Sequence, residues 1–195
     1  MNAEKIILFD GSSTDGWADR LGNKVTWTID GDGAMTVVSG DIISKETYGD
    51  AMIHVEFRCP VMPGESGQGR GNSGVYIHGC YEIQVLDSYG IENPSYGDCG
   101  AIYQLLKPSV NASLPAGEWQ TYDILVRAPR YDANGEIREN ARLTLIQNGL
   151  PVHNNATLER NTPGGIYDEV VAKGPLFLQD HGNPVSYRNI WMIKL

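Results

Sequence analysis

Glycine and proline divide this chain into short pieces, and this feature limits the fold more than any other. The 195 residues include 23 Gly and 10 Pro, which favour tight turns over long helices. Between these breaks, apolar residues recur at every second position, as Ile53, Val55 and Phe57 do within 51–58. Such alternation is typical of a strand with one buried face. The chain is therefore expected to be all-β.

The turns between these segments indicate antiparallel pairing. Asn148-Gly149 separates two alternating runs and is a strong hairpin signal. Many short strands in a chain of this length predict a single domain over 1–195, built as an antiparallel β-sandwich (jelly roll) of two large sheets. The expected strands are 27–30, 34–38, 41–44, 51–58, 73–78, 81–87, 100–106, 119–127, 141–147, 150–154, 175–180 and 185–195.

Composition excludes several classes of protein. With 41% hydrophobic and 20% charged residues, the chain is neither disordered nor a coiled coil. A net charge of -9 opposes binding to nucleic acid. The apolar run 6–9 is too short for a signal peptide or a membrane span. We therefore expect neither a nucleic-acid nor a membrane partner. The expected location is the cytoplasm, or the periplasm or the outside of the cell if a leader has been removed. The sequence does not specify the oligomeric state.

The three cysteines, Cys59, Cys80 and Cys99, are odd in number and lack CxxC spacing. This fits a reducing compartment, with one Cys80–Cys99 bridge as the alternative. Three long irregular stretches, 60–71, 88–98 and 155–173, are expected to rim a site, because loops longer than about 12 residues are often functional.

The densest polar constellation lies in the expected strand 81–87. Glu82 and Gln84 share one face of that strand, and Asp87 joins them through a bulge. Two carboxylates and an amide serve proton transfer, sugar binding or a divalent cation. The alternative is a solvated strand face with a terminal Asp.

Other segments carry residue types common in ligand contacts at alternate positions. If these segments share one sheet, their side chains form a continuous polar concave surface. His181 is notable because it follows a strand end and precedes a glycine turn, where functional side chains are often displayed. The residues are His54, Glu56, Arg58, Tyr76, His78, Gln104, Gln179, His181 and Arg188.

Several motifs in order resemble the 3-keto-disaccharide hydrolase domain family, whose members adopt the concanavalin A-like lectin/glucanase sandwich. The spacing Glu82-x-Gln84-x-x-Asp87 is also similar to the acidic strand of laminarinase-type glycosidases, but Gln and Asp depart from that acidic pattern. The family motifs are Leu8-Phe9-Asp10-Gly11, Gly16-Trp17, Trp27, Asp30-Gly31, Phe57-Arg58, Asn72-Ser73-Gly74-Val75-Tyr76, Tyr81 to Asp87, Gly100-Ala101-Ile102-Tyr103, Gly117-Glu118-Trp119, Asn148-Gly149, Leu178-Gln179-Asp180-His181-Gly182 and Arg188-Asn189-Ile190.

The resemblance implies cleavage of glycosides that carry a ketone at C3, by C2 proton abstraction, elimination of the C1 substituent and hydration. This chemistry needs a general base, an electrophile for the enolate oxygen and hydrogen bonds to the ring. We expect Glu82 or His181 as the base, Arg58 and Arg188 at the enolate, and Asp87 at the leaving group. The residues expected to bind substrate are Asn72, Tyr76, Gln84, Tyr103, Gln179 and Arg188.

This scheme requires no cofactor, although a divalent cation held by Glu82 and His181 is a second choice of electrophile. Arg58 and Arg188 have a structural alternative, an ion pair with Glu56 or Asp180.

Two other functions compete with this prediction. A non-catalytic, lectin-like carbohydrate-binding module would use the same polar face, since a fold does not decide function. An ordinary glycosidase needs two carboxyl groups about 5–5.5 or 6.5–9.5 Å apart. A flat strand separates Glu82 from Asp87 by roughly 16 Å.

Overall fold

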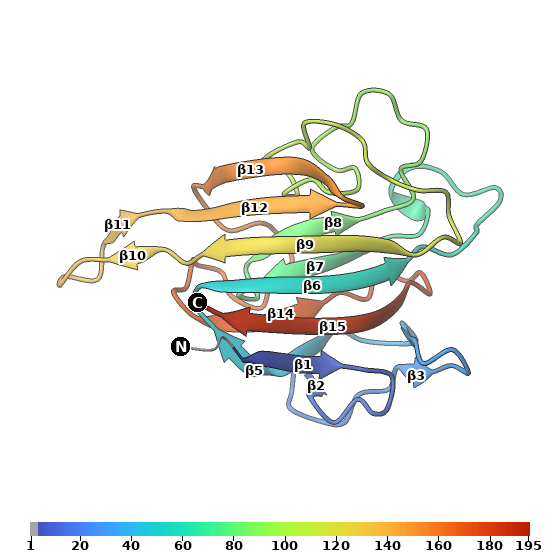
Figure 1. The fold of residues 1–195 in the computed structure, drawn as a ribbon, viewed down its shortest axis with the longest axis horizontal. Coiled ribbons are helices and arrows are strands. Elements are labelled where there is room, and N and C mark those ends of the chain that lie inside the picture. The colour runs from blue at the N-terminus through green and yellow to red at the C-terminus, as the bar shows by residue number, and fades with distance from the viewer. Residues whose placement is uncertain (1–3) are drawn as a thin grey trace.

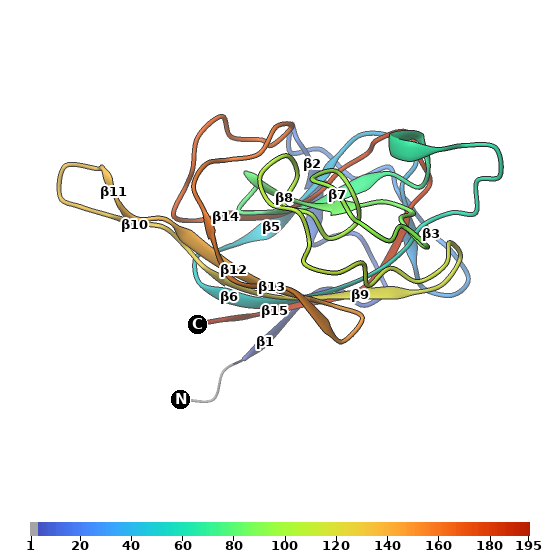
Figure 2. The same cartoon turned by 90° about the horizontal axis from the view of Figure 1, so that it is seen from above.

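Two antiparallel sheets pack face to face in the computed structural model, which describes residues 4–195 (Figures 1 and 2). The larger sheet has eight strands in the order β13-β12-β9-β6-β15-β4-β3, with β1 also paired to β15, and the smaller has five in the order β2-β5-β14-β7-β8. Strands β10 and β11 form a separate ribbon. The elements are β1 (Lys5–Phe9), β2 (Trp17–Asp19), β3 (Thr28–Ile29), β4 (Met35–Thr36), β5 (Ile42–Tyr48), β6 (Ala51–Arg58), the 3-10 turn η1 (Gly67–Gly69), β7 (Ser73–Ile77), β8 (Tyr81–Val85), β9 (Gln120–Arg127), β10 (Arg130–Tyr131), β11 (Ile137–Glu139), β12 (Ala141–Gln147), β13 (Leu150–Leu158), β14 (Gly174–Leu178) and β15 (Ser186–Lys194).

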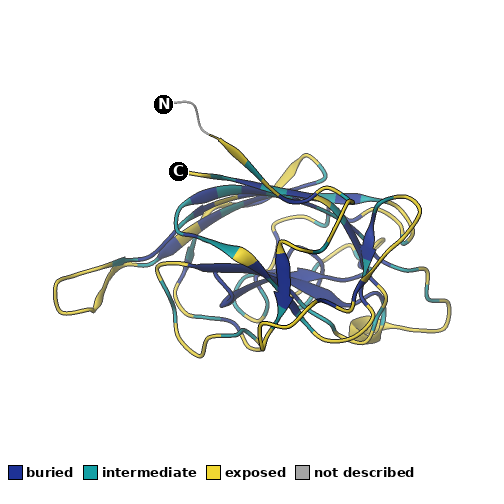
Figure 3. Ribbon diagram, turned by 90° about the horizontal axis from the view of Figure 1, so that it is seen from below, coloured by how far each residue is buried: buried dark blue, intermediate teal, exposed yellow. Residues whose placement is uncertain are grey.

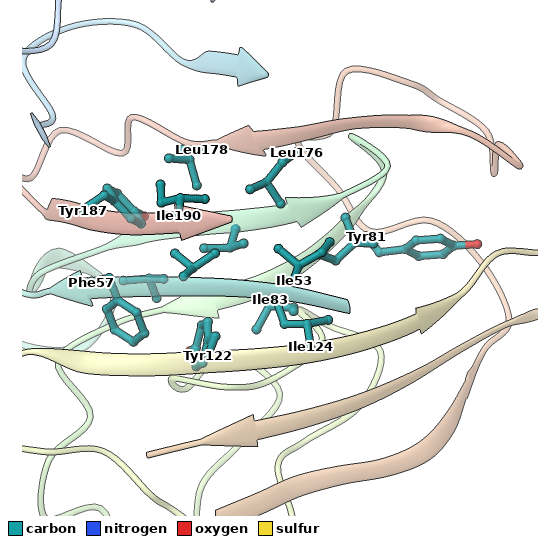
Figure 4. Close-up of a cluster of buried hydrophobic side chains, with 14 of the residues drawn as sticks. Ile53, Phe57, Tyr81, Ile83, Tyr122, Ile124, Leu176, Leu178, Tyr187 and Ile190 are labelled. Atoms are coloured by element: carbon teal, nitrogen blue, oxygen red, sulfur yellow. The ribbon is translucent and has the colours of Figure 1, made fainter. Parts of the chain in front are cut away.

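The core lies between the two sheets, where buried residues, dark blue in the ribbon of Figure 3, alternate along the strands and the apolar side chains of Figure 4 meet. In β6, Ile53, Val55 and Phe57 are fully buried while their neighbours are half-buried, so the alternation read from the sequence is confirmed. On the smaller sheet, Ile83 and Leu178 face the same core. Alternate residues of each strand therefore point away from the core, and on the smaller sheet those residues build the site described below.

The all-β sandwich predicted from the sequence is confirmed. Strands β6 and β12 begin and end at the residues predicted for them, 51–58 and 141–147. The segment 100–106 is an exception, because it forms a turn in which Ile102 bridges Ile83 and Leu106. Gln104 adopts a positive φ of 57° there, which strand geometry does not allow. The structure adds β1, β2, β10 and β11, which the sequence analysis did not include.

The turn 98–106 closes the free edge of β8, the last strand of the smaller sheet. The backbone carbonyl of Glu82 accepts from the Tyr103 N–H at 3.1 Å. The Gln84 N–H donates to the carbonyl of Ala101, and the Gln84 carbonyl accepts from the Gly100 N–H, both at 2.9 Å. The strand that carries the site is thus hydrogen-bonded on both edges.

Cys59, Cys80 and Cys99 are free and buried, so the alternative Cys80–Cys99 bridge does not form. Burial raises the pKa of the Cys80 thiol to about 11. Within residues 4–195, the structure contains no helix of the length and apolarity needed to cross a membrane.

Candidate functional site

A small cleft opens on the outer face of the smaller sheet, on the side where the long loops lie in Figure 2. Its volume is about 110 Å³. Strands β7 and β8 contribute lining residues, Gln179 follows the end of β14, and the other lining residues belong to loops. Most of the residues expected from the sequence to act on a sugar meet here. The lining residues are Gln68, Asn72, Tyr76, Glu82, Gln84, Tyr103, Pro163, Gly164, Gln179 and His181.

The register of β7 and β8 brings the polar side chains together. Tyr76 lies directly opposite Glu82, and Gly74 lies opposite Gln84, so these positions share the outer face. Gly74 has no side chain to fill the floor, and a Cβ there would lie 2.8 Å from Glu82 Oε1. The glycine therefore leaves the space that the Glu82 carboxyl occupies.

Glu82 is the one carboxylic acid among the described residues that line the cleft, and it is 3% exposed. Burial disfavours its charged form and raises its pKa to about 7, although a hydrogen bond from Tyr76 opposes this shift. The Tyr76 hydroxyl donates to Glu82 Oε2 at 2.8 Å. A carboxyl with this pKa exchanges protons readily near neutral pH.

The Tyr76 hydroxyl has three polar neighbours and one proton. Gln179 Nε2 donates to it at 3.1 Å. Glu82 Oε2, at 2.8 Å, and the carbonyl oxygen of Pro163, at 3.0 Å, are alternative acceptors of the single hydroxyl proton. The ring is held by stacking on Phe177, with centroids 4.4 Å apart. When Glu82 is protonated it can donate to Tyr76, and the tyrosine proton then turns to Pro163.

Three amide side chains that line the cleft are joined by hydrogen bonds. Gln68 Oε1 accepts from Gln84 Nε2 at 2.9 Å and from Asn72 Nδ2 at 3.2 Å. Gln68 Nε2 in turn donates to the carbonyl oxygen of Gly97 at 2.8 Å. Asn72 and Gln84 are buried, whereas Gln68 is exposed on the 3-10 turn η1.

The loop 159–173 is fixed against the sheet by two residues. Thr162 Oγ1 accepts from the Glu82 backbone N–H at 2.8 Å, and Thr162 N–H donates to the carbonyl of Cys80 at 2.9 Å. Arg20, in the turn that follows β2, donates to the carbonyl of Gly164 at 3.0 Å and pairs with Asp41 at 2.6 Å. His181 and Tyr103 complete the rim; His181 is exposed and Tyr103 half-buried.

Arg58 and Arg188, expected at the enolate, lie elsewhere. Both belong to the larger sheet, on strands β6 and β15, and neither lines the cleft. Arg188 pairs with Glu56 at 2.5 Å, which is one of the ion pairs weighed as its structural alternative, and Arg58 lies 3.9 Å from Asp30. The expectation of one continuous polar sheet face is therefore wrong.

The cause of that error is that strand alternation identifies a face but not the sheet to which it belongs. The guanidinium groups of Arg58 and Arg188 lie over the Trp119 ring, 4.6 and 4.0 Å from its centroid. His54 joins the same outer surface of the larger sheet by stacking on Trp191. These residues form a polar surface on the side of the sandwich away from the cleft.

Asp87, His78 and Gln104 also do not line the cleft. Asp87 lies beyond the end of β8 and pairs with Arg70 at 3.0 Å. His78 is buried, its Nε2 donates to the carbonyl oxygen of Gly49 at 2.8 Å, and burial lowers its pKa. The cleft-lining residues that the sequence analysis did not single out are Gln68, Pro163 and Gly164, all within loops that it expected to rim a site.

Metal binding can be judged from the donor set. Within residues 4–195, no three His, Cys, Asp or Glu side chains come together as a metal-binding group. Glu82 and His181 do line the same cleft, beside amide oxygens of the kind that bind hard cations.

A family match and a 38% identical relative define a carbohydrate-related β-sandwich protein of the glycosyl hydrolase-like class. The chain belongs to the 3-keto-alpha-glucoside-1,2-lyase-like domain family, whose sequence pattern matches residues 4–193. A search of curated proteins gives no match.

One solved structure supports this assignment, and two others share the fold. A candidate glycosyl hydrolase from Parabacteroides distasonis is 38% identical with a TM-score of 0.89, and the match covers 98% of this chain and 84% of that one. A second candidate glycosyl hydrolase from the same organism is 21% identical with a TM-score of 0.72, covering 98% and 94%. The carbohydrate-binding module CBM66 from Bacillus subtilis, 12% identical with a TM-score of 0.53 over 92% and 96%, shares the fold alone.

Proposed function

We propose that this protein cleaves 3-keto-glycosides by proton abstraction at C2, elimination of the C1 substituent and hydration, with Glu82 as the general base. The observation that carries the proposal is a single buried carboxyl, with its pKa raised to about 7, at the floor of a cleft lined by amides and tyrosines. A C3 ketone acidifies the C2 hydrogen, so one base of this kind suffices. The family and the Parabacteroides distasonis relatives make a glycoside the natural substrate class.

The proposed reaction balances with water as the only other reactant. Glu82 takes the C2 proton, and the electrons of that C–H bond pass to the C3 oxygen. The enolate then restores the ketone, forms the C1=C2 bond and breaks the C1–O bond, while His181 gives a proton to the leaving oxygen. Water adds its hydroxyl to C1 and returns a proton to His181, and Glu82 returns its proton to C2.

Tyr76 and Gln179 support the base in this proposal. When Glu82 is ionised, the Tyr76 hydroxyl donates to it at 2.8 Å. When Glu82 holds the C2 proton, it donates to the Tyr76 oxygen, whose own proton turns to the Pro163 carbonyl at 3.0 Å. Tyr76 therefore satisfies both protonation states of the base.

A two-carboxylate glycosidase fits this cleft less well. Its mechanism requires a second carboxyl near the first, and Glu82 is the one acidic residue among the described lining residues. A lectin-like module is the second candidate, because the cleft amides suit sugar hydroxyls equally. The raised pKa of Glu82 favours the enzyme, since sugar binding alone does not need a titrating carboxyl.

The test is product formation from a 3-keto-glucoside and its unoxidised parent, measured side by side with and without a chelator. We expect cleavage of the keto compound only, and loss of turnover in Glu82→Gln. Glu56→Gln is the matched control, because Glu56 lies on the larger sheet and pairs with Arg188. Binding of both sugars without cleavage would instead establish the lectin-like module.

The chelator identifies the electrophile. Loss of activity on chelation, restored by added Mn²⁺ or Ca²⁺, would assign Glu82 and His181 as cation ligands and remove Glu82 as the base. Retained activity would leave the enolate to the groups of the protein itself.

A further inference from the structure

The cleft already holds a carbonyl group, the side chain of Gln68, between two amide N–H donors. Gln84 Nε2 donates to Gln68 Oε1 at 2.9 Å, and Asn72 Nδ2 donates to the same oxygen at 3.2 Å. Two convergent N–H donors on one carbonyl oxygen are the arrangement that enzymes use to stabilise an oxyanion.

Backbone carbonyls fix the direction of both donors. Asn72 Nδ2 also donates to the carbonyl of Gln68 at 2.7 Å, and Gln84 Nε2 to that of Gly97 at 3.2 Å. Because a backbone carbonyl only accepts, neither amide can rotate its oxygen into that position. Each amide nitrogen uses one hydrogen on the backbone and keeps the second for the oxygen between them.

The Gln68 side chain, whose carbonyl lies between the two donors, extends from the protein surface. Gln68 is exposed, its turn η1 has no buried residues, and glycines at 67 and 71 have positive φ. Asn72 and Gln84 are each 1% exposed and belong to the folded floor of the cleft. The donors are thus buried, while the side chain that lies between them extends from an exposed surface turn.

We infer that Asn72 Nδ2 and Gln84 Nε2 form an oxyanion hole for the C3 oxygen of the substrate, and that Gln68 fills this hole until the substrate ketone replaces it. The inference rests on the proposed function and supplies the electrophile that Arg58 and Arg188 were expected to provide. Gln68 is a positioning residue in this scheme, and Asn72 and Gln84 contact the reacting atoms.

The spacing suits the reaction. Glu82 and Gln84 point the same way from β8 and stand two residues apart, which is about 6.6 Å along a strand. The C2 hydrogen and the C3 oxygen are on neighbouring atoms of the sugar, so a base and a donor at this separation reach both. As Glu82 removes the C2 proton, the C–H electrons move into the C2–C3 bond and the C3=O electrons onto oxygen, where both N–H groups receive the charge.

The experiment follows deuterium uptake at C2 of 3-keto-1,5-anhydroglucitol in D₂O by NMR. This ketone has no exocyclic substituent at C1, so the exchange at C2 reports enolate formation without glycoside cleavage. We expect Asn72→Asp and Gln84→Glu each to slow the exchange about a hundredfold, as removal of one oxyanion donor does in other enzymes. Gln68→Ala is expected to speed exchange at low ketone concentration and to tighten ketone binding several-fold, because the internal competitor is gone.

A matched control separates these effects from damage to the fold. Asn111 Nδ2 also donates to two backbone carbonyls, those of Ser88 at 2.7 Å and Ile91 at 2.9 Å, outside the cleft. Asn111→Asp should lower the melting temperature without slowing exchange. The gain expected in Gln68→Ala has no explanation in misfolding.

The outcomes distinguish the two proposals. If the wild type cleaves 3-keto-glucosides but exchange persists at full rate in Asn72→Asp and Gln84→Glu, the oxyanion hole is overturned and the proposed function stands. Slower exchange or weaker ketone binding in Gln68→Ala would also overturn it. If no 3-keto-glycoside is cleaved, the proposed function fails, while calorimetric binding of the same ketone to the variants still tests the hole.

Discussion

At the scale of single residues, the site depends on how Glu82 shares a proton with its neighbours. Its carboxyl is buried and its pKa is raised to about 7, while the Tyr76 hydroxyl opposes the rise by donating to the charged form. The sequence predicted that Glu82 and Gln84 lie side by side, because residues at i and i+2 share a strand face. The pairing of Glu82 with Tyr76 comes instead from the register of β7 and β8. The sequence did not predict the raised pKa, which comes from burial of the carboxyl in the folded chain.

Tyr76→Phe should move the pH dependence of kcat/KM. Without the hydroxyl, the ionised Glu82 loses a donor, so its pKa rises and the acid limb moves to higher pH. Initial rates across pH 5 to 9 measure this shift. Tyr187→Phe is the control, because Tyr187 is a buried tyrosine that bonds Ser73 at 2.7 Å in the core; a limb that moves equally in both variants would contradict the prediction.

At the scale of elements, the sequence predicted strands better than their assignment to sheets. The bounds of β6 agree with the predicted 51–58, yet the polar face of β6 looks away from the cleft. Alternation of apolar and polar residues shows only that one face of a strand is buried. Strands of both sheets in a sandwich bury one face, so the pattern does not say to which sheet a strand belongs. Long-range pairing, such as that of β14 with β7, decides which faces join, and the sequence pattern carries no direct signal of it.

Gly74→Ala tests the register of β7 and β8. The added Cβ would lie 2.8 Å from both Glu82 Oε1 and a Tyr76 ring carbon, so the carboxyl must move. We expect kcat to fall at least tenfold, because the Glu82 carboxyl and the Tyr76 ring that bonds it are both displaced. We also expect the melting temperature to fall, because the Tyr76 ring is buried and stacked on Phe177. Turnover and thermal unfolding of the same preparation measure both. Unchanged turnover would show that the position of Glu82 is not critical.

At the scale of the whole molecule, the raised pKa of Glu82 makes stability depend on pH. The folded state binds this proton more tightly than the unfolded state, in which the carboxyl titrates near 4.5. Its favourable contribution is therefore complete below pH 4.5 and is lost as pH rises through about 7. The protein keeps a destabilising group where the proposed chemistry needs it.

Glu82→Gln should remove this dependence. The unfolding free energy of the variant minus that of the wild type is expected to rise by about 3 kcal/mol from pH 4.5 to about pH 8. The size of the rise follows because each pKa unit corresponds to about 1.4 kcal/mol. Urea unfolding at several pH values measures the difference. Glu56→Gln serves as the control, because the pKa of Glu56 is lowered and its contribution has the opposite sign. A constant difference between Glu82→Gln and the wild type across this range would contradict the prediction.

The turn 98–106 has a consequence for the solubility of the folded chain. It bonds the outer edge of β8 through Gly100, Ala101 and Tyr103, so this edge offers no free row of backbone groups to another molecule. An unprotected strand edge is a template for intermolecular pairing and aggregation. The segment that contributes Tyr103 to the cleft therefore also keeps neighbouring molecules from extending the sheet.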